Sequence, residues 1–224
     1  MREIFGSELQ ELHTRFSEMG MMVNEAIYNA VKAFVDHDRE LAQNVINNDN
    51  QINAREVDLE QRSFEMIALQ QPVTSDLRMI VTIMKASSDL ERMGDHAVSI
   101  ARSTIRVKGN PRVPEIEADI AKMARFVEKM VAAILDAYVK TDAKKAKKIA
   151  GQDKKVNQAF QDIYTDCIKQ MQQSPETVVG SSDYMMVASY LERIGDYVTN
   201  LSEWIIYLKT NKIVELNNND NERM

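Results

Sequence analysis

The sequence is poor in residues that break helices and in aromatic residues. Its 224 residues include only 7 glycines and 4 prolines, and aromatic side chains account for 6% of the chain. Long stretches contain neither glycine nor proline, which favours helices throughout. We therefore expect an all-α fold.

Cysteine, long apolar runs and an excess of positive charge are also missing. The single cysteine, Cys167, cannot form an internal disulfide and fits a reducing compartment. No uninterrupted apolar run approaches the roughly 20 residues that span a bilayer. The start of the chain lacks the apolar core of a secretion signal. We expect a cytoplasmic protein with at most peripheral membrane association.

The charge balance argues against a nucleic-acid partner. The formal net charge is -6, whereas phosphate contacts need a basic face. One local basic patch is present, and we interpret it as a solvated helix face. It comprises Lys144, Lys145, Lys147 and Lys148.

Motifs of catalysis are absent from the sequence as well. There is no phosphate-binding Gly-x-x-x-x-Gly-Lys loop and no nucleophile motif. Glu-x-x-His, the spacing from which ferritin-like di-iron bundles build their site, does not occur. Nothing in the sequence points to an enzyme, and we expect none.

What the chain does contain is an internal repeat of roughly a hundred residues. The segment Glu91-Arg92-Met93-Gly94-Asp95 returns as Glu192-Arg193-Ile194-Gly195-Asp196. Earlier echoes occur in the same order, which indicates a duplicated structural unit. They pair Ala33-Phe34-Val35 with Ala137-Tyr138-Val139, Asp38 with Asp142, Asp49 with Asp153, and Asn53 with Asn157.

Apolar periodicity and breakers divide each repeat into three helices. We expect helices at about 7–36, 39–70, 74–107, 115–140, 142–172 and 175–209. The breaker-rich stretch 109–114 separates the repeats. Long helices joined by short turns pack antiparallel. The predicted fold is all-α, with two tandem pseudo-symmetric antiparallel three-helix bundles at 1–110 and 111–210 and a polar tail at 211–224, disordered from 217.

The repeated pentads place two carboxylates on one helix face. Glu91 and Asp95 are four residues apart, so they lie one turn apart and repel each other unless a cation compensates. A glycine in the middle of a helix costs roughly 1 kcal/mol relative to alanine. Because that cost recurs at Gly94 and Gly195, we expect another group to approach closely there.

The helix before each pentad adds further oxygen ligands. Sets of oxygen ligands suit Mg, Mn, Ca or iron, whereas zinc usually recruits histidine or cysteine, and no histidine has a repeat mate. Alternatively, Arg92 and Arg193 form ion pairs with the carboxylates and the pentads are packing elements. The predicted metal ligands are Glu91, Asp95, Glu192, Asp196, Asp49, Asn53, Asp153 and Asn157.

These motifs resemble one known family. Tandem Leu-Glu-Arg-(Met/Ile)-Gly-Asp segments, the upstream Asp-x-x-(Ile/Val)-Asn and the stretch 71–78, Gln-Pro-Val-Thr-Ser-Asp-Leu-Arg, are similar to the PhoU family of phosphate-transport regulators over residues 5–210. The resemblance implies two helical bundles, a homodimer and multinuclear metal clusters on the acidic motifs. Asn53 and Asn157 stand where many relatives have aspartate, and the loss of that negative charge is expected to weaken metal affinity or to change the number of ions bound.

The resemblance also implies a cytoplasmic role in phosphate uptake and phosphate-starvation signalling. The expected partners are the ATPase subunit of a phosphate ABC transporter and a phosphate-sensing histidine kinase. The favoured function is a metal-binding adaptor between them, with Fe, Mn, Mg, Zn or Ca as the ion. A structural scaffold without functional metal and a di-metal carboxylate enzyme remain as alternatives.

Overall fold

The computed structural model describes residues 2–216, and side chains from residue 5 onward. Seven α-helices and one short 3-10 turn occur in this part of the chain. They are α1 (Arg2–Asp36), α2 (Arg39–Gln70), α3 (Thr74–Val107), α4 (Pro114–Val139), α5 (Ala143–Ala150), α6 (Asp153–Gln173), η1 (Pro175–Thr177) and α7 (Val178–Thr210).

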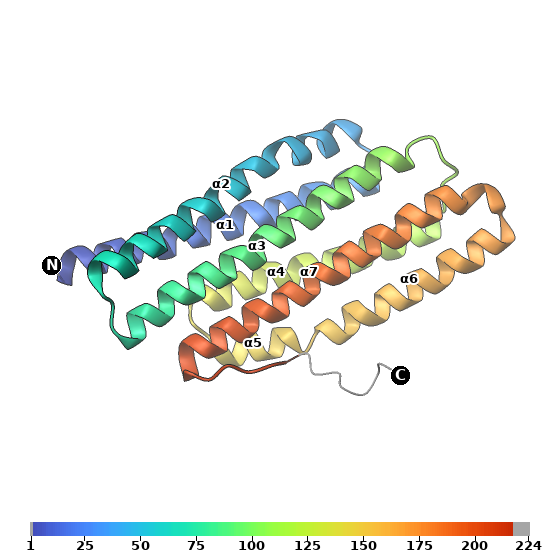
Figure 1. The fold of residues 1–224 in the computed structure, drawn as a ribbon. Helices are drawn as coiled ribbons and strands as arrows, with labels where there is room; N and C mark the ends of the chain where they lie inside the picture. Colours follow the sequence, from blue (N-terminus) through green and yellow to red (C-terminus); the bar gives the residue numbers. More distant parts are fainter. Residues whose placement is uncertain (1, 217–224) are drawn as a thin grey trace.

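The helices form two elongated antiparallel bundles side by side, which confirms the predicted fold class (Figure 1). Helices α1, α2 and α3 pack together, and α4, α5, α6 and α7 make the second group. Helices α3 and α7 also pack against each other, so the two pentad-bearing helices run along the middle of the molecule. The boundaries 1–110 and 111–210 stay a prediction, as does the disordered tail, because residues 217–224 lie outside the described part.

The core is built from the apolar stripes of the long helices. Leu12, Phe16 and Met19 of α1 are buried, as are Leu90 and Met93 of α3. Burial of one such side chain contributes roughly 1.5 to 3 kcal/mol. Among the described residues, no helix combines the length and the apolar content that crossing a bilayer requires.

The turn before the second helix of each bundle is the same in both repeats. His37 and Thr141 adopt left-handed backbone conformations, with φ of 54° and 48°. The next residue caps the following helix: Asp38 Oδ1 accepts from the Leu41 amide and Asp142 Oδ1 from the Lys145 amide, each at 3.0 Å. The repeated aspartates therefore mark a turn and a helix cap that have the same geometry in both repeats.

The structure differs from the predicted helices in three places. Gly151 and Gln152 divide the helix expected at 142–172 into α5 and α6, because glycine weakens a helix interior and Gln152 bonds back to Ile149 in a tight turn. Pro175 opens a 3-10 turn before α7. The first helix begins at Arg2 rather than near residue 7.

The repeated cap predicts equal losses in the two bundles. Asp38→Ala and Asp142→Ala each remove a side-chain acceptor from the first turn of a helix, and each is expected to lower the free energy of unfolding by about 1 kcal/mol. Denaturant unfolding measures the change. Asp36→Ala serves as the control, because Asp36 is exposed at the end of α1. A loss confined to one repeat contradicts the equivalence of the two turns.

Candidate metal centres

In the first bundle, α2 presents an aspartate and an asparagine one turn apart towards α3. Asn53 Nδ2 donates to Asp49 Oδ2 at 3.4 Å. The other oxygens of this pair, Asp49 Oδ1 and Asn53 Oδ1, are buried and have no hydrogen-bond partner among the described residues. A buried oxygen without a partner costs roughly 1 to 3 kcal/mol, so such atoms call for an explanation.

The second bundle repeats this arrangement atom for atom. Asn157 Nδ2 donates to Asp153 Oδ2 at 3.0 Å. Asp153 Oδ1 and Asn157 Oδ1 are again buried, and again lack a partner within residues 2–216. Four unpaired oxygens in two matched pairs are difficult to ascribe to chance packing.

Both pentads lie in the same environment on their helices. From Leu90 to Ile100, and from Leu191 to Leu201, the sequence of buried, half-buried and exposed positions is identical. The glycine is buried, the two acids are half-buried and the arginine is exposed in each repeat. The acids therefore sit at the edge of the core, where a charge is only partly hydrated.

The pentad glycines allow the aspartates to come close. A Cβ atom at position 195 would lie 2.9 Å from Asp153 Oδ1, closer than any ordinary contact. At position 94 it would meet Ile52 Cδ1 at 3.3 Å and Asp49 Oδ1 at 3.7 Å. The close approach expected from the helix-breaking cost of Gly94 and Gly195 is that of the preceding helix, with its carboxylate at the contact.

In the first bundle the acids raise one another's pKa. Burial and the neighbouring Asp95 raise the pKa of Asp49. Burial, Asp95 and Glu56 raise the pKa of Glu91, and Arg92 opposes this. The carboxylates of α2 and α3 therefore face each other closely enough for repulsion to matter.

The second bundle shows the stronger effect. Burial and Asp196 raise the pKa of Asp153 to about 6. Burial and Asp196 also raise the pKa of Glu192, and burial raises that of Asp196. Phe160 and Tyr164 stand where the first repeat has Glu56 and Glu60, so this site has fewer acids but a less hydrated environment.

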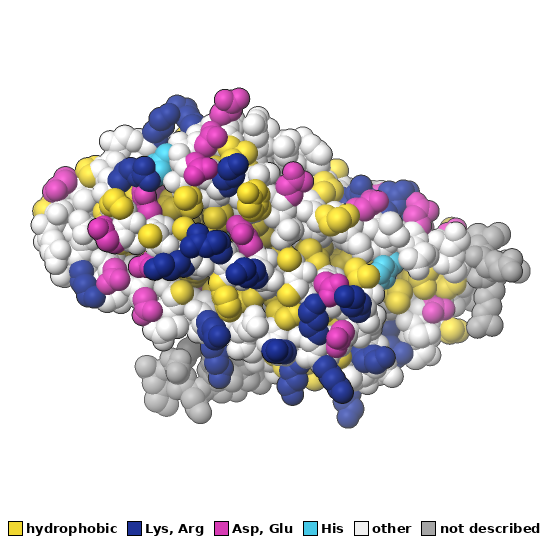
Figure 2. Space-filling model, turned by 180° about the vertical axis from the view of Figure 1, so that it is seen from behind, with side chains coloured by type: hydrophobic (Ala, Val, Ile, Leu, Met, Phe, Trp, Pro, Cys, Tyr) yellow, Lys and Arg dark blue, Asp and Glu magenta, His cyan; other side chains and the backbone are white. Residues whose placement is uncertain are grey.

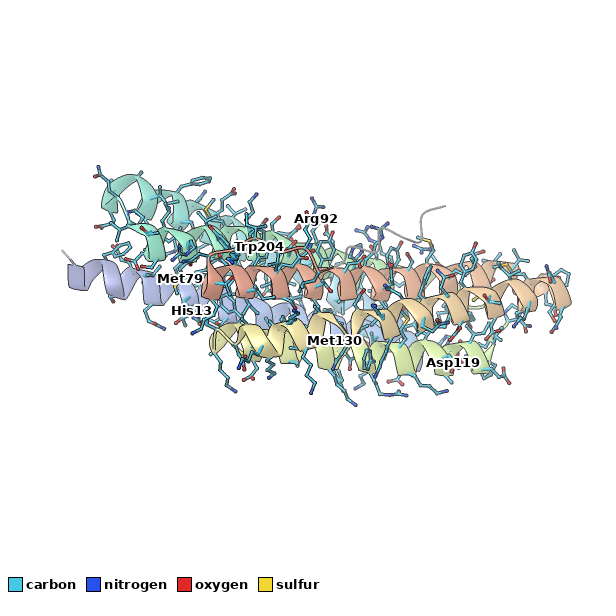
Figure 3. All side chains as sticks on the ribbon, turned by 90° about the horizontal axis from the view of Figure 1, so that it is seen from below. His13, Met79, Arg92, Asp119, Met130 and Trp204 are labelled. Atoms are coloured by element: carbon cyan, nitrogen blue, oxygen red, sulfur yellow. The ribbon has the colours of Figure 1, made fainter. Side chains whose placement is uncertain are left out.

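Arginine pairing accounts for only part of the first site. Arg92 lies 3.5 Å from Asp95 and 3.6 Å from Glu91, and its side chain is 60% exposed. Such exposed pairs contribute at most about 1 kcal/mol. Arg193 forms no ion pair with any described residue. Figure 3 places Arg92 on the side of the molecule opposite Asp119 of α4.

The carboxylates do not converge on one point. In the part of the chain that the structure describes, no three histidine, cysteine or acidic side chains are placed so as to hold a metal ion. The predicted ligand set of each bundle is therefore complete only if the amide oxygen of Asn53 or Asn157 also binds the ion. The two halves of each predicted site are thus adjacent, without forming a finished coordination sphere.

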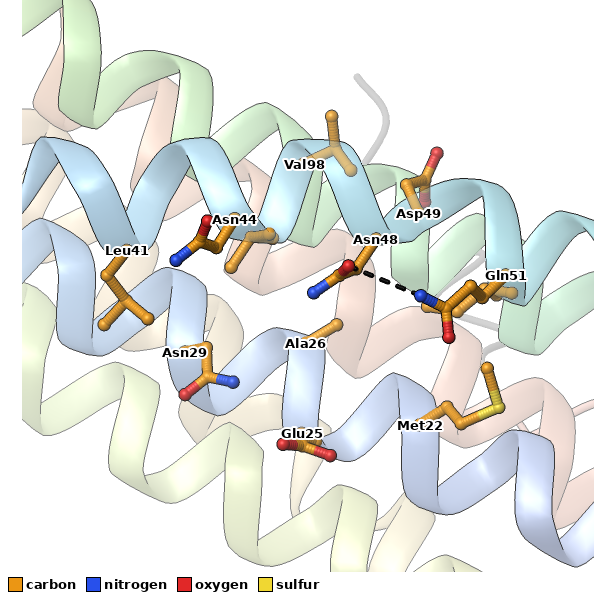
Figure 4. Close-up of a pocket in the computed structure, with 12 residues that line it drawn as sticks. Met22, Glu25, Ala26, Asn29, Leu41, Asn44, Asn48, Asp49, Gln51 and Val98 are labelled. Carbon is orange, nitrogen blue, oxygen red and sulfur yellow. Dashed lines mark hydrogen bonds between the residues drawn. The ribbon is translucent and has the colours of Figure 1, made fainter.

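A pocket of about 150 Å³ adjoins Asp49 between α1 and α2 (Figure 4). Amide side chains line it, including Asn29, Asn44, Asn48 and Gln51, and Gln51 donates to Asn48 at 3.4 Å. In the close-up the Asp49 carboxylate points away from Asn29. The pocket is therefore a polar groove between α1 and α2, next to Asp49.

The histidines have contacts other than the acidic pairs. The ring of His96 lies 5.7 Å from that of Tyr190 and 5.8 Å from that of Tyr197, in contact with α7. His37 lies 3.0 Å from Glu117, and His13 stacks on Tyr138. Each of the three histidine side chains therefore contacts residues outside the predicted set of metal ligands.

One half-buried carboxylate beside the first pentad, that of Asp89, was not predicted from the sequence. Asp89 accepts hydrogen bonds from Asn200 Nδ2 at 3.2 Å and from Trp204 Nε1 at 3.0 Å. Both donors belong to α7, so these bonds join the two bundles. The signal was available in the single tryptophan, because an indole N–H that is partly withdrawn from solvent needs an acceptor.

Comparison with known proteins agrees with this architecture. The PhoU domain model matches residues 16–104 and 120–205. This chain belongs to the PhoU family. The phosphate-specific transport system accessory protein PhoU homolog of Streptococcus pneumoniae is 35% identical over 97% of this chain and 100% of its own length. Escherichia coli PhoU is 32% identical over 91% of this chain and 84% of its own length.

Two solved PhoU structures share the fold. The crystal structure of the phosphate transport system regulatory protein PhoU from S. pneumoniae superposes with a TM-score of 0.89 at 33% identity, covering 95% of this chain and 100% of that one. PhoU from Pseudomonas aeruginosa gives 0.87 at 34% identity, with 93% and 100% covered. The doubled PhoU repeat is therefore shared at the level of three-dimensional structure.

The glycine contacts predict unequal effects of the same substitution. Gly195→Ala must displace the Asp153 carboxylate, whereas Gly94→Ala meets mainly the flexible end of Ile52. Both changes gain roughly 1 kcal/mol of helix preference. We expect Gly195→Ala to be the less stable variant by at least about 1 kcal/mol in denaturant unfolding. Equal stabilities would contradict a contact between position 195 and Asp153.

The raised pKa of Asp153 predicts a pH-dependent cost. The folded metal-free protein holds this proton up to about pH 6, whereas the unfolded chain releases it near pH 4. The contribution of Asp153 to stability therefore falls as the pH rises between these values. Asp153→Asn is expected to raise the free energy of unfolding by on the order of 2 kcal/mol at pH 8, and much less at pH 4.

Asp58→Asn is the matched control for that measurement. Asp58 is hydrogen-bonded to Arg62 and Arg15, which lower its pKa. Its neutralisation should therefore destabilise the protein at pH 8. Two results would refute the assignment of this pH-dependent cost to Asp153. One is an Asp58→Asn variant that is more stable at pH 8, and the other is an Asp153→Asn variant whose effect on the free energy of unfolding does not change with pH.

Proposed function

We propose that this protein is a regulator of phosphate uptake and phosphate-starvation signalling. It acts as a metal-binding adaptor between a phosphate ABC transporter and a sensor histidine kinase. Its full-length similarity to proteins named phosphate-specific transport system accessory proteins supports the transport role. The observation that carries the metal proposal is the repeated pair of unpaired buried oxygens beside repeated acidic pairs.

The residue set fits an oxygen-preferring cation. Each bundle offers two carboxylates on the pentad helix and a carboxylate with an amide oxygen on the preceding helix. A cation such as Fe, Mn, Mg or Ca would supply positive charge where these groups repel one another. The aspartate is held in place by its asparagine, and the pentad acids, being half-buried, retain freedom to turn towards an ion.

Metal binding would stiffen the contact between two helices in each bundle. Because α3 and α7 pack against each other, an ion at either site acts on the same central pair of helices. The adaptor presents surfaces and needs no catalytic group. Occupancy of the sites would set how firmly those surfaces are held, which is how a small ion can regulate a helical protein.

The second candidate is a scaffold without functional metal. The absence of a three-acid group among the described residues and the ion pairs of Arg92 favour this candidate in the first bundle. It leaves the unpaired oxygens of both bundles without an explanation. The ion pairs of Arg92 go to Glu91 and Asp95, and Arg193 forms none with the described residues. Metal content separates the two candidates.

The decisive measurement is elemental analysis of protein purified without chelator. Glu91→Gln with Asp95→Asn should remove the metal of one bundle and leave helical content unchanged by circular dichroism. Glu192→Gln with Asp196→Asn should remove that of the other. The control is Asp162→Asn with Asp166→Asn, an exposed pair also four residues apart on a helix. Unchanged stoichiometry in both pentad variants would leave the scaffold as the function.

The adaptor role is tested separately by association. With the transporter present and phosphate plentiful, the protein should co-purify with the ATPase subunit of a phosphate importer. The two pentad variants should lower that recovery in proportion to the metal they lose. Retention of metal with no recovery of the ATPase subunit would refute the adaptor role while leaving the metal sites in place.

A further inference from the structure

The second bundle carries a lysine-rich surface that the first bundle lacks. Residues 140–155 contain seven lysines against two aspartates. The equivalent segment, 36–51, contains one arginine against four acidic residues. A chain with a net charge of -6 therefore has a pronounced local excess of positive charge at one end of the second bundle.

The fold does not require these lysines. The capping aspartates, Asp38 and Asp142, make the same bond in both repeats. The apolar positions are also kept: Ala42 and Val45 are buried in α2, and Ala146 and Ile149 in α5. At the seven lysine positions the first bundle has acidic, amide and apolar side chains, and it still forms a capped helix there, which differs only in continuing past the point where α5 ends. The lysines are therefore not needed for the cap or for the buried face of this helix.

Most of this positive charge is free and faces solvent. Lys144, Lys147 and Lys148 of α5 are exposed, as are Lys154 and Lys155 at the start of α6. These five residues, the lysine surface, form no ion pair with any side chain in the described range.

The three acids within residues 136–155 do not neutralise the lysine surface. Asp136 pairs with both Lys140 and Lys145. Asp142 caps α5, and Asp153 is only 4% exposed. The excess of positive charge is therefore not cancelled locally.

Helix α4 extends the basic surface. Lys155 Nζ lies 5.9 Å from the centre of the Phe126 ring, and Arg125 and Lys129 are exposed on the same helix. Val139, beside Lys140, is 56% exposed. Seen from behind, the molecule shows lysine and arginine gathered over the lower half of this face, among hydrophobic side chains and with few acids (Figure 2).

We propose that this lysine surface binds the anionic headgroups of a phospholipid bilayer. Lysine is a compact charge on a flexible stem, whereas arginine is the residue enriched in protein interfaces, from which lysine is depleted. Residues 140–155 contain seven lysines and no arginine. Scattered lysines with a few apolar neighbours over a broad face suit a charged membrane surface better than they suit a protein partner.

The overall negative charge does not prevent this contact. Charges are screened beyond about 8 Å at physiological ionic strength. A helix of 26 residues such as α4 is about 40 Å long. The acids at the far end of the molecule are therefore screened from headgroups at the lysine surface, and the protein would lie on the bilayer without inserting a helix.

Vesicle binding tests the proposal. The full chain should co-sediment with vesicles of phosphatidylglycerol and phosphatidylcholine at 30:70, a probe composition of about 30% anionic lipid, and not with phosphatidylcholine alone. Lys144→Gln, Lys147→Gln and Lys148→Gln together should lower the partition coefficient on the order of a hundredfold, at about fivefold per charge. Raising the salt should release the wild-type protein.

The control removes the same charge elsewhere. Arg39 starts α2, Lys108 follows the last residue of α3 and Lys169 lies near the end of α6, and all three are exposed. These helix ends lie at the opposite end of the bundles from α5 (Figure 1). Changing all three residues to glutamine should leave binding within about twofold. Thermal melts check that both triple variants are folded.

Three outcomes overturn the proposal: failure of the wild type to bind anionic vesicles, equal binding to neutral vesicles, and equal losses in the two triple variants. Lysine-dependent binding to an acidic protein or to DNA in the absence of vesicle binding overturns it as well. Removal of metal by a chelator should leave vesicle binding unchanged, so the test does not depend on the metal sites.

Discussion

The close contact between each pentad glycine and the preceding helix is the constraint on which the rest depends. It brings the aspartate of one helix against the acids of another in both bundles. Desolvation and repulsion then work against the folded state, as the raised pKa of Asp153 shows. The hydrophobic core supplies the stability that holds these acids in place. Such a site is suited to respond to a cation, because a bound cation would offset both the desolvation of the acids and the repulsion between them.

Hydrogen bonds between the bundles join the two helices that carry the pentads. Helices α3 and α7 pack along the centre of the molecule, and Asp89 receives hydrogen bonds from Asn200 and Trp204 across their interface. Helices α2 and α6 each pack against one member of this central pair. The half-buried Asp89 carboxylate therefore gives the two bundles a shared polar contact in addition to their helix packing.

Much of the fold could be predicted because duplication and helix breakers are visible in the sequence. The second helix ends before Pro72 and the third before Gly109, as the breakers predicted. The break at Gly151 was missed, since its equivalent in the first repeat, Asn47, lies inside a continuous helix. At the site, spacing predicted which residues share a face. It could not predict that the carboxylates stop short of a common point, because that depends on side-chain rotations and on the distance between helices.

The two repeats have kept what folding needs and diverged in what faces outward. Caps, glycines and buried apolar positions recur, whereas residues 140–155 exchange acids and amides for lysines. Sequence patterning treats a run of lysines as an ordinary solvated face, and for a helix taken alone that interpretation is sound. For Lys144, Lys147 and Lys148 the structure agrees with that interpretation, because all three are exposed. The first repeat adds that the equivalent helix forms without lysines, so the fold does not account for their number. The positive charge is concentrated in one repeat, and five of the seven lysines of residues 140–155 form no ion pair among the described side chains. The proposed membrane contact explains why a charge that the fold does not require is present in that repeat alone.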